Sequence, residues 1–118
     1  MKINKITPVL VVDAVEPALA CWEALGFEAT VRVPHGDAVG FAILVRGDHE
    51  LMLQSQASLA ADLPAVAERN AGVLYLDVDA LPAAPPGEVL IRERTTFYGA
   101  RETWVRVPGG QVLGFAVH

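Results

Sequence analysis

The stretch LVVDAV at residues 10–15 returns as LDVDAL at residues 76–81. A second pair follows in the same order, because ILVRGDHELML at residues 43–53 and VRVPGGQVLGF at residues 105–115 share a glycine and the apolar positions around it. Repetition of two phrases in one order indicates two copies of a supersecondary unit. The chain has 118 residues, which suits one hydrophobic core better than two independent ones. We therefore expect a single domain, residues 1–118, that both copies share.

Composition narrows the classes of partner. The sequence is 53% hydrophobic and 19% charged, which is typical of an ordered globular chain. Its formal charge is −5, and it lacks the basic stripe that nucleic-acid binding needs, so nucleic acid is not expected as a partner. The acidic balance fits ordinary solubility and would also favour a cationic ligand.

Cys21 is the only cysteine. An intramolecular disulfide and a zinc site of several thiolates are therefore excluded, and a cytoplasmic protein is expected. No apolar run approaches the roughly 20 residues needed to span a bilayer, so a membrane partner is not expected either.

Hydrophobic periodicity predicts the first unit, residues 1–56. A continuous apolar run predicts a buried strand, and a helix follows it, with Asp13 in capping position and Gly26 as the stop. Three strands complete the unit, the last two joined by a Gly47-Asp48 turn. The strands are expected at residues 6–12, 27–33, 39–46 and 50–54, with a loop at 34–37.

A linker helix is expected at residues 57–70, with Ser58 as a possible cap. The second unit, residues 71–118, repeats the strands at residues 72–78, 88–94, 101–107 and 112–117, the last entered through a turn at Pro108-Gly109-Gly110. Four breakers, Pro82, Pro85, Pro86 and Gly87, stand where its helix should be. The fold class is therefore α+β, with two βαβββ units, the second having its helix shortened or replaced by a Pro-rich loop.

Few residues are suited to catalysis. Of the three histidines, only His118 could turn toward a pocket, because it lies four residues beyond Gly114 and thus on the same strand face. A frayed terminus is the plainer interpretation. Thr95 to Trp104 combines aromatics, Arg101 and Glu102 in ten residues. Such a mixture is typical of a small-molecule site, and equally of a hairpin whose aromatics complete the core.

With both repeats placed, the chain resembles the vicinal oxygen chelate superfamily, which includes glyoxalase I, extradiol dioxygenases and the fosfomycin and bleomycin resistance proteins. The resemblance covers essentially the whole chain. It implies curved mixed sheets around a cleft. The stretches that carry it are ITPVLVVD at 6–13, CWEALGF at 21–27, YGARE at 98–102 and VPGGQ at 107–111.

Metal-dependent members of the superfamily place ligands at positions that correspond here to Thr7, Met52, Val73 and Gly114. A hydroxyl, a thioether, an isopropyl group and a glycine cannot bind a divalent ion well. No metal and no other cofactor are therefore expected. The resemblance is closest to the metal-free bleomycin-resistance branch, which implies a homodimer that sequesters a small cationic or aromatic ligand in a cleft.

Strand alternation extends these inward positions to a possible lining, in which Gly114 leaves room for a ligand. The same side chains could simply fill the interior. No catalytic residue is assigned. The expected ligand-binding residues are Thr7, Phe41, Met52, Gln54, Tyr75, Tyr98, Arg101, Glu102, Trp104 and Gly114.

Three hypotheses about function follow. The favoured one is a metal-independent small-molecule-binding protein of the bleomycin-resistance type. The alternative is a glyoxalase- or dioxygenase-like enzyme with non-standard catalytic residues, drawn from Glu50, Glu102 or His118. An interaction subunit without a small ligand is the third.

Overall fold

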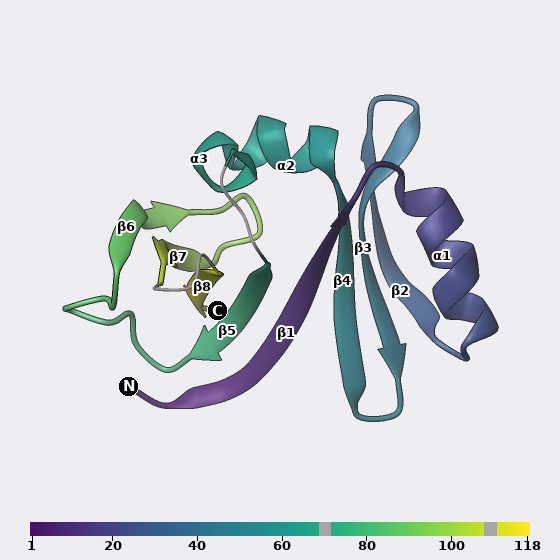
Figure 1. Ribbon diagram of the computed structural model, residues 1–118. Helices are drawn as coiled ribbons and strands as arrows, with labels where there is room; N and C mark the ends of the chain where they lie inside the picture. Colours follow the sequence, from purple (N-terminus) through teal and green to yellow (C-terminus); the bar gives the residue numbers. More distant parts are fainter. Residues whose placement is uncertain (69–71, 108–110) are drawn as a thin grey trace. The chain divides into compact units, whose positions relative to one another are not determined.

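The computed structural model describes residues 1–68, 72–107 and 111–118. It has the expected α+β class (Figure 1). The elements are β1 (Ile3–Val12), α1 (Val15–Ala24), β2 (Glu28–His35), β3 (Ala38–Arg46), β4 (His49–Ser55), α2 (Gln56–Asp62), α3 (Pro64–Ala67), β5 (Val73–Val78), β6 (Glu88–Thr95), β7 (Arg101–Arg106) and β8 (Val112–Val117). Within the described ranges, no helix is long and apolar enough to cross a membrane.

The chain divides into two compact units, residues 8–67 and residues 1–7 with 68–118. The strand order in the first is β2-β3-β4-β1, and in the second it is β1-β5-β8-β7-β6. Each unit pairs its first strand in parallel with its last strand, through Val9 opposite Met52 and Tyr75 opposite Gly114. The other pairings among β2–β4 and among β6–β8 are antiparallel. The repeated phrases in the sequence thus correspond to repeated strand connections.

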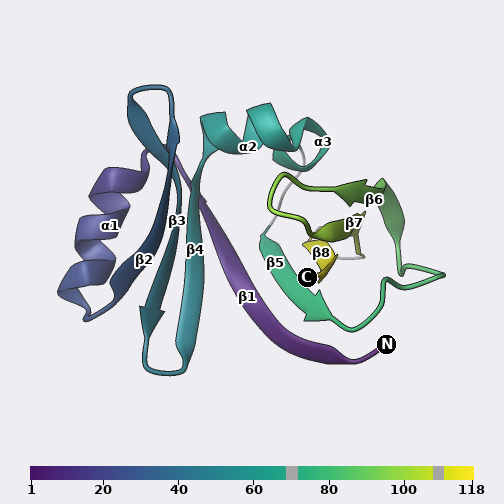
Figure 2. The ribbon, with the colours of Figure 1, turned by 180° about the vertical axis from the view of Figure 1, so that it is seen from behind.

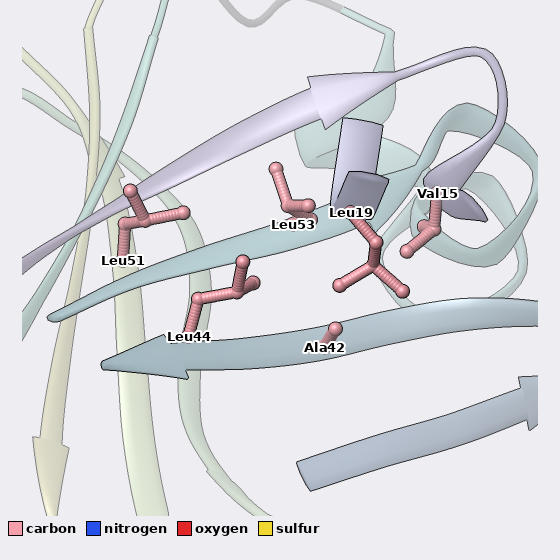
Figure 3. Close-up of a cluster of buried hydrophobic side chains, with 6 residues drawn as sticks. All are labelled: Val15, Leu19, Ala42, Leu44, Leu51 and Leu53. Carbon is pink, nitrogen blue, oxygen red and sulfur yellow. The ribbon is translucent and has the colours of Figure 1, made fainter. Parts of the chain in front are cut away.

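The core of the unit formed by residues 8–67 lies between α1 and the strands (Figure 3). Val15 and Leu19 point from the helix onto side chains of β3 and β4, where Leu44 and Leu53 are fully buried. Burial of such a side chain stabilises a fold by about 1.5–3 kcal/mol. The six residues drawn are Val15, Leu19, Ala42, Leu44, Leu51 and Leu53.

The second unit lacks the helix. Residues 79–87, all of them described, contain bends but no helix, as the prolines predicted. The beginning of β1 lies beside β5 (Figure 2), where the Lys2 amide donates to the Asp79 carboxylate at 2.7 Å and Asn4 donates to Asp77 at 3.1 Å.

A core of Leu76, Val78, Val105 and Phe115 lies on one face of the strands of the second unit.

Several predicted boundaries were wrong. The linker helix is two helices, α2 and α3, which break at Leu63 because the residue before a proline is disfavoured in helical conformation. Its predicted last residue, Asn70, lies outside the described residues, as do Pro108, Gly109 and Gly110 of the predicted turn.

The predicted helix caps also differ. The cap of α2 is Ser55, whose hydroxyl accepts from the Ser58 amide at 3.1 Å, because the helix begins directly after β4. The N-cap of α1 is Ala14 and makes no side-chain cap. Glu16 accepts instead from the Val39 amide at 2.9 Å.

Candidate functional site

The strand register places Tyr75, Glu102 and Trp104 on one face of the second unit. Tyr75 and Trp104 both lie opposite Gly114, and Glu102 lies opposite Ala116. Because side chains alternate along a strand, these residues share a face, and the core around Val105 and Phe115 lies on the other. The register therefore shows which face of the strand each residue around position 101 occupies, a question that the sequence alone did not decide.

Glu102 is the centre of this face. Its carboxylate is fully buried and accepts four hydrogen bonds. Oε2 accepts from the hydroxyls of Tyr75 and Tyr98 at 2.5 and 2.7 Å. Oε1 accepts from Arg94 Nε at 2.8 Å and from the indole nitrogen of Trp104 at 3.0 Å. A buried charge is tolerated only when it is paired and hydrogen-bonded, and this one is both.

The four donors decide the ionisation state of Glu102. Burial raises the pKa of the carboxyl, but the hydrogen bonds from Tyr75, Tyr98, Trp104 and Arg94 together outweigh burial and hold it below its ordinary range. Glu102 is therefore a carboxylate at neutral pH, and the neighbouring hydroxyls can only donate to it.

Both phenols are correspondingly difficult to ionise. Burial, and then the hydrogen bond to Glu102, raises the pKa of Tyr75 well above its ordinary range. Burial also raises the pKa of Tyr98 to about 12, despite an opposing effect of Tyr75. The two tyrosines are neutral hydrogen-bond donors in the folded protein.

Arg94 was missed by the sequence analysis because of a β-bulge. Ile91 lies opposite Trp104, yet Arg94 rather than residue 93 lies opposite Glu102. The extra residue is accommodated at Glu93, whose φ of 50° is left-handed and whose amide donates to the Thr103 hydroxyl. A bulge changes which side chains share a face, so simple alternation from Ile91 gives the wrong residue.

His118 also joins this group. Its ring lies parallel to the Tyr98 ring, with centroids 6.3 Å apart and an interplanar angle of 20°. Its Nε2 is 3.4 Å from the Tyr75 hydroxyl. Its spacing of four residues from Gly114 predicts this position on the strand face. The other interpretation, a frayed terminus, does not predict these contacts. We call Tyr75, Tyr98, Trp104 and His118, arranged around Glu102, the aromatic face.

The space beside Gly114 is filled. A β-carbon at this position would lie 2.7 Å from two ring carbons of Trp104. The room that we expected for a ligand is therefore occupied by the indole ring, and the glycine serves close packing within the protein.

Other predicted site residues lie elsewhere. Arg101 is exposed and lies on the opposite face from Glu102, since it pairs with Val117. Phe41, Met52 and Gln54 share a face in the other unit, where Phe41 lies opposite Gln54, and Gln54 donates to Ser58 at 3.2 Å. Thr7 is buried.

The residues that the resemblance places at metal-ligand positions offer few donor atoms. Val73 has no donor atom, Met52 offers only a thioether, and Gly114 is covered by the Trp104 ring. Among residues 1–68, 72–107 and 111–118, no three His, Cys, Asp or Glu side chains are grouped as metal ligands would be. The carboxylate of Glu102 is not free to bind a metal either, because it already accepts four hydrogen bonds.

No protein-family model and no curated protein matches the sequence. Solved structures do match the fold. A glyoxalase/bleomycin resistance protein/dioxygenase superfamily member from Vibrio splendidus aligns with 99% of this chain and 100% of its own, with a TM-score of 0.69 and 16% identity. The chain has the fold of that superfamily member.

Two further structures agree with this result. A hypothetical protein from Bacillus halodurans aligns with 97% of this chain and 94% of its own, with a TM-score of 0.69 and 11% identity. A protein from Staphylococcus aureus aligns with 99% and 98%, with a TM-score of 0.65 and 17% identity. The fold expected from the sequence is confirmed. Sequence identities this low show a likeness of fold alone.

Proposed function

We propose that the chain is a metal-independent small-molecule-binding protein that holds its ligand against the aromatic face. As the resemblance to the bleomycin-resistance branch implies, a second copy of the chain completes a cleft around the ligand. The ligand is sequestered without being chemically changed.

The observation that carries this proposal is the buried, four-fold hydrogen-bonded carboxylate of Glu102. It fixes two phenol rings and one indole ring on one side of the strands. Rings held in place lose little conformational entropy when a ligand binds. Their exposed parts supply contact area, which comes mainly from the tyrosines because Trp104 is buried. Tyr98 is 52% exposed, so its ring is accessible to a ligand.

Metal independence is supported by the donor atoms at the superfamily's metal positions. Thr7, Met52, Val73 and Gly114 together offer one hydroxyl and one thioether as side-chain donors. A divalent ion needs several oxygen or nitrogen donors that converge on it.

Binding is also favoured over general-base catalysis by Glu102. A catalytic base needs a pKa near the working pH and a free lone pair toward the substrate. The pKa of Glu102 is lowered, and its two oxygens already accept four hydrogen bonds. The same carboxylate is well suited to a positioning role.

A thermal-shift screen in the presence of a chelator tests the proposal. Aromatic amines, aromatic acids and cationic glycopeptides are the first compounds to include. A ligand at 100 times its dissociation constant stabilises the fold by about 2.7 kcal/mol. Hits that Tyr98→Ala abolishes, while the variant still unfolds cooperatively, support the site. Hits that require added nickel, zinc, iron or manganese contradict it.

The homodimer is tested separately by sedimentation equilibrium. We expect a species of twice the 12.6 kDa chain mass at micromolar concentration. A monomer that still binds the ligand would remove the second copy from the proposal and leave the aromatic face as the site.

A further inference from the structure

The direction of each hydrogen bond on the aromatic face can be assigned. An ionised carboxylate only accepts, so the single hydroxyl protons of Tyr75 and Tyr98 are both directed at Glu102. The Trp104 N–H and the Arg94 Nε–H are directed at it as well. The hydroxyl donors of Tyr75 and Tyr98 and the indole donor of Trp104 therefore all point to Glu102 and are not available to a ligand.

The groups left for a ligand are electron-rich. Each tyrosine oxygen has lost its donor to Glu102 and keeps only lone pairs for other partners. The charge of Glu102 also polarises these hydroxyls toward stronger acceptance. The faces of the aromatic rings carry the negative end of their quadrupole. Arg94 does not reverse this balance, because it forms an ion pair with Glu102 at 2.8 Å.

The direction of the hydrogen bond between His118 and Tyr75 follows from the same assignment. Its Nε2 lies 3.4 Å from the Tyr75 oxygen, whose proton is already directed at Glu102. A hydrogen bond between them must therefore be donated by the imidazole, which assigns the Nε2–H tautomer to neutral His118. The Tyr75 oxygen is thus an acceptor toward both histidine and ligand.

We propose that Glu102 is a specificity-determining residue: by taking the hydroxyl protons of Tyr75 and Tyr98, it makes the aromatic face select ligands that bring N–H donors on a cation, namely primary or secondary ammonium groups beside an aromatic ring. This inference rests on the proposed function and adds the chemical class of the ligand. It separates recognition by donated hydrogen bonds from cation–π attraction alone, which needs no N–H group.

Three probes of similar size separate these possibilities. Benzylammonium carries N–H donors and a positive charge, benzyltrimethylammonium carries the charge without donors, and benzoate is an anion. We expect benzylammonium to bind about tenfold more tightly than benzyltrimethylammonium, because a hydrogen bond to a charged group contributes about 1.5–3 kcal/mol. Benzoate should bind most weakly. Dissociation constants come from NMR titrations of the full chain.

Glu102→Gln tests the residue itself. The amide is uncharged and has one acceptor oxygen in place of two, so it cannot accept from all four donors and no longer polarises the tyrosine oxygens. The preference for benzylammonium over benzyltrimethylammonium should fall to about twofold or less by loss of such a bond. Glu23→Gln is the matched control: it removes the same charge from an exposed position on α1 and should keep the tenfold preference.

A second variant covers the case in which Glu102→Gln does not fold. Tyr98→Phe keeps the half-exposed ring and removes one acceptor oxygen, and the preference should again fall. Equal binding of the two cations by the unmodified chain overturns the inference about specificity but leaves the proposed function standing. Failure of all three probes to bind overturns the inference about specificity, and failure of the whole thermal-shift screen overturns the proposed function as well.

Discussion

The indole ring of Trp104 lies against Gly114 of the neighbouring strand, so closely that a β-carbon on the glycine would fall 2.7 Å from two ring carbons. The ring cannot easily move away, because its nitrogen donates to Glu102 at 3.0 Å. Gly114→Ala should therefore destabilise the fold by about 1–3 kcal/mol, as overpacking does. Urea unfolding monitored by circular dichroism measures the loss.

A double-mutant cycle identifies the cause of that loss. Trp104→Phe removes the second ring and should relieve the clash, so the two substitutions together should cost less than the sum of their separate effects. Strictly additive effects, or a fully stable Gly114→Ala variant, would show that the ring is not where the structure places it.

Arg94 stabilises the buried charge of Glu102. Arg94→Met leaves that carboxylate without its ion pair and should lower the free energy of unfolding by about 1–3 kcal/mol, less than for a fully buried pair because Arg94 is partly exposed. Arg92→Met, at an exposed position on the same strand, is the control and should change stability little. Equal effects of the two substitutions would contradict the role of Arg94.

Acid sensitivity provides an independent readout of the same pair. The pKa of Glu102 is lowered in the folded state, so its stabilising contribution is present above the unfolded value, about 4.3, and is lost as pH falls through the folded value below it. Arg94→Met should raise the folded pKa and move the loss of stability to higher pH. Unfolding curves collected from neutral to acidic pH detect this shift.

The chain contains only two tyrosines, and both hydroxyls donate to Glu102. The folded pKa of Tyr98 is raised to about 12 and that of Tyr75 is also raised. Their contribution to stability is therefore complete below about pH 10, the unfolded value, and is lost as pH rises through the folded values. Ultraviolet absorbance should show no phenolate at pH 10 in the native protein. Half-ionisation of either tyrosine near pH 10 in a folded sample would contradict the hydrogen-bond network.

Two buried threonines form a matched pair. Thr7 Oγ1 is buried without a hydrogen-bond partner among the described residues, whereas Thr103 Oγ1 accepts from the Glu93 amide at 3.2 Å. Thr7→Val should leave stability unchanged or raise it by about 1 kcal/mol, and Thr103→Val should lower it by about 1–2 kcal/mol. Thermal unfolding compares them. A large loss for Thr7→Val would mean that its hydroxyl has a partner.

The sequence predicted most of the elements, because apolar periodicity and the internal repeat depend on local patterns, but it did not decide which face of the strand Arg101 and Glu102 occupy. Tyr75, Glu102 and Trp104 do share a face as their register requires. Simple alternation of side chains along the strand fails at Arg94, because a bulge at Glu93 inserts one residue that no sequence pattern predicts.

Contacts across strands could not be predicted from the sequence either. Gly114 suggested free space, but the volume beside a glycine depends on its neighbour, and here that neighbour is Trp104. The saturation of Glu102 by four donors depends in the same way on side-chain geometry from β5, β6, β7 and the turn before β7.

The two tryptophans allow the most direct test of ligand binding at the aromatic face. Trp104 belongs to that face, and Trp22 packs on Phe27 in the other unit, so their indole N–H signals serve as site and internal reference. With a chelator present, benzylammonium should shift the Trp104 signal in a saturable manner and leave the Trp22 signal in place. An unmoved Trp104 signal, or one that moves only after a divalent metal is added, would contradict the account.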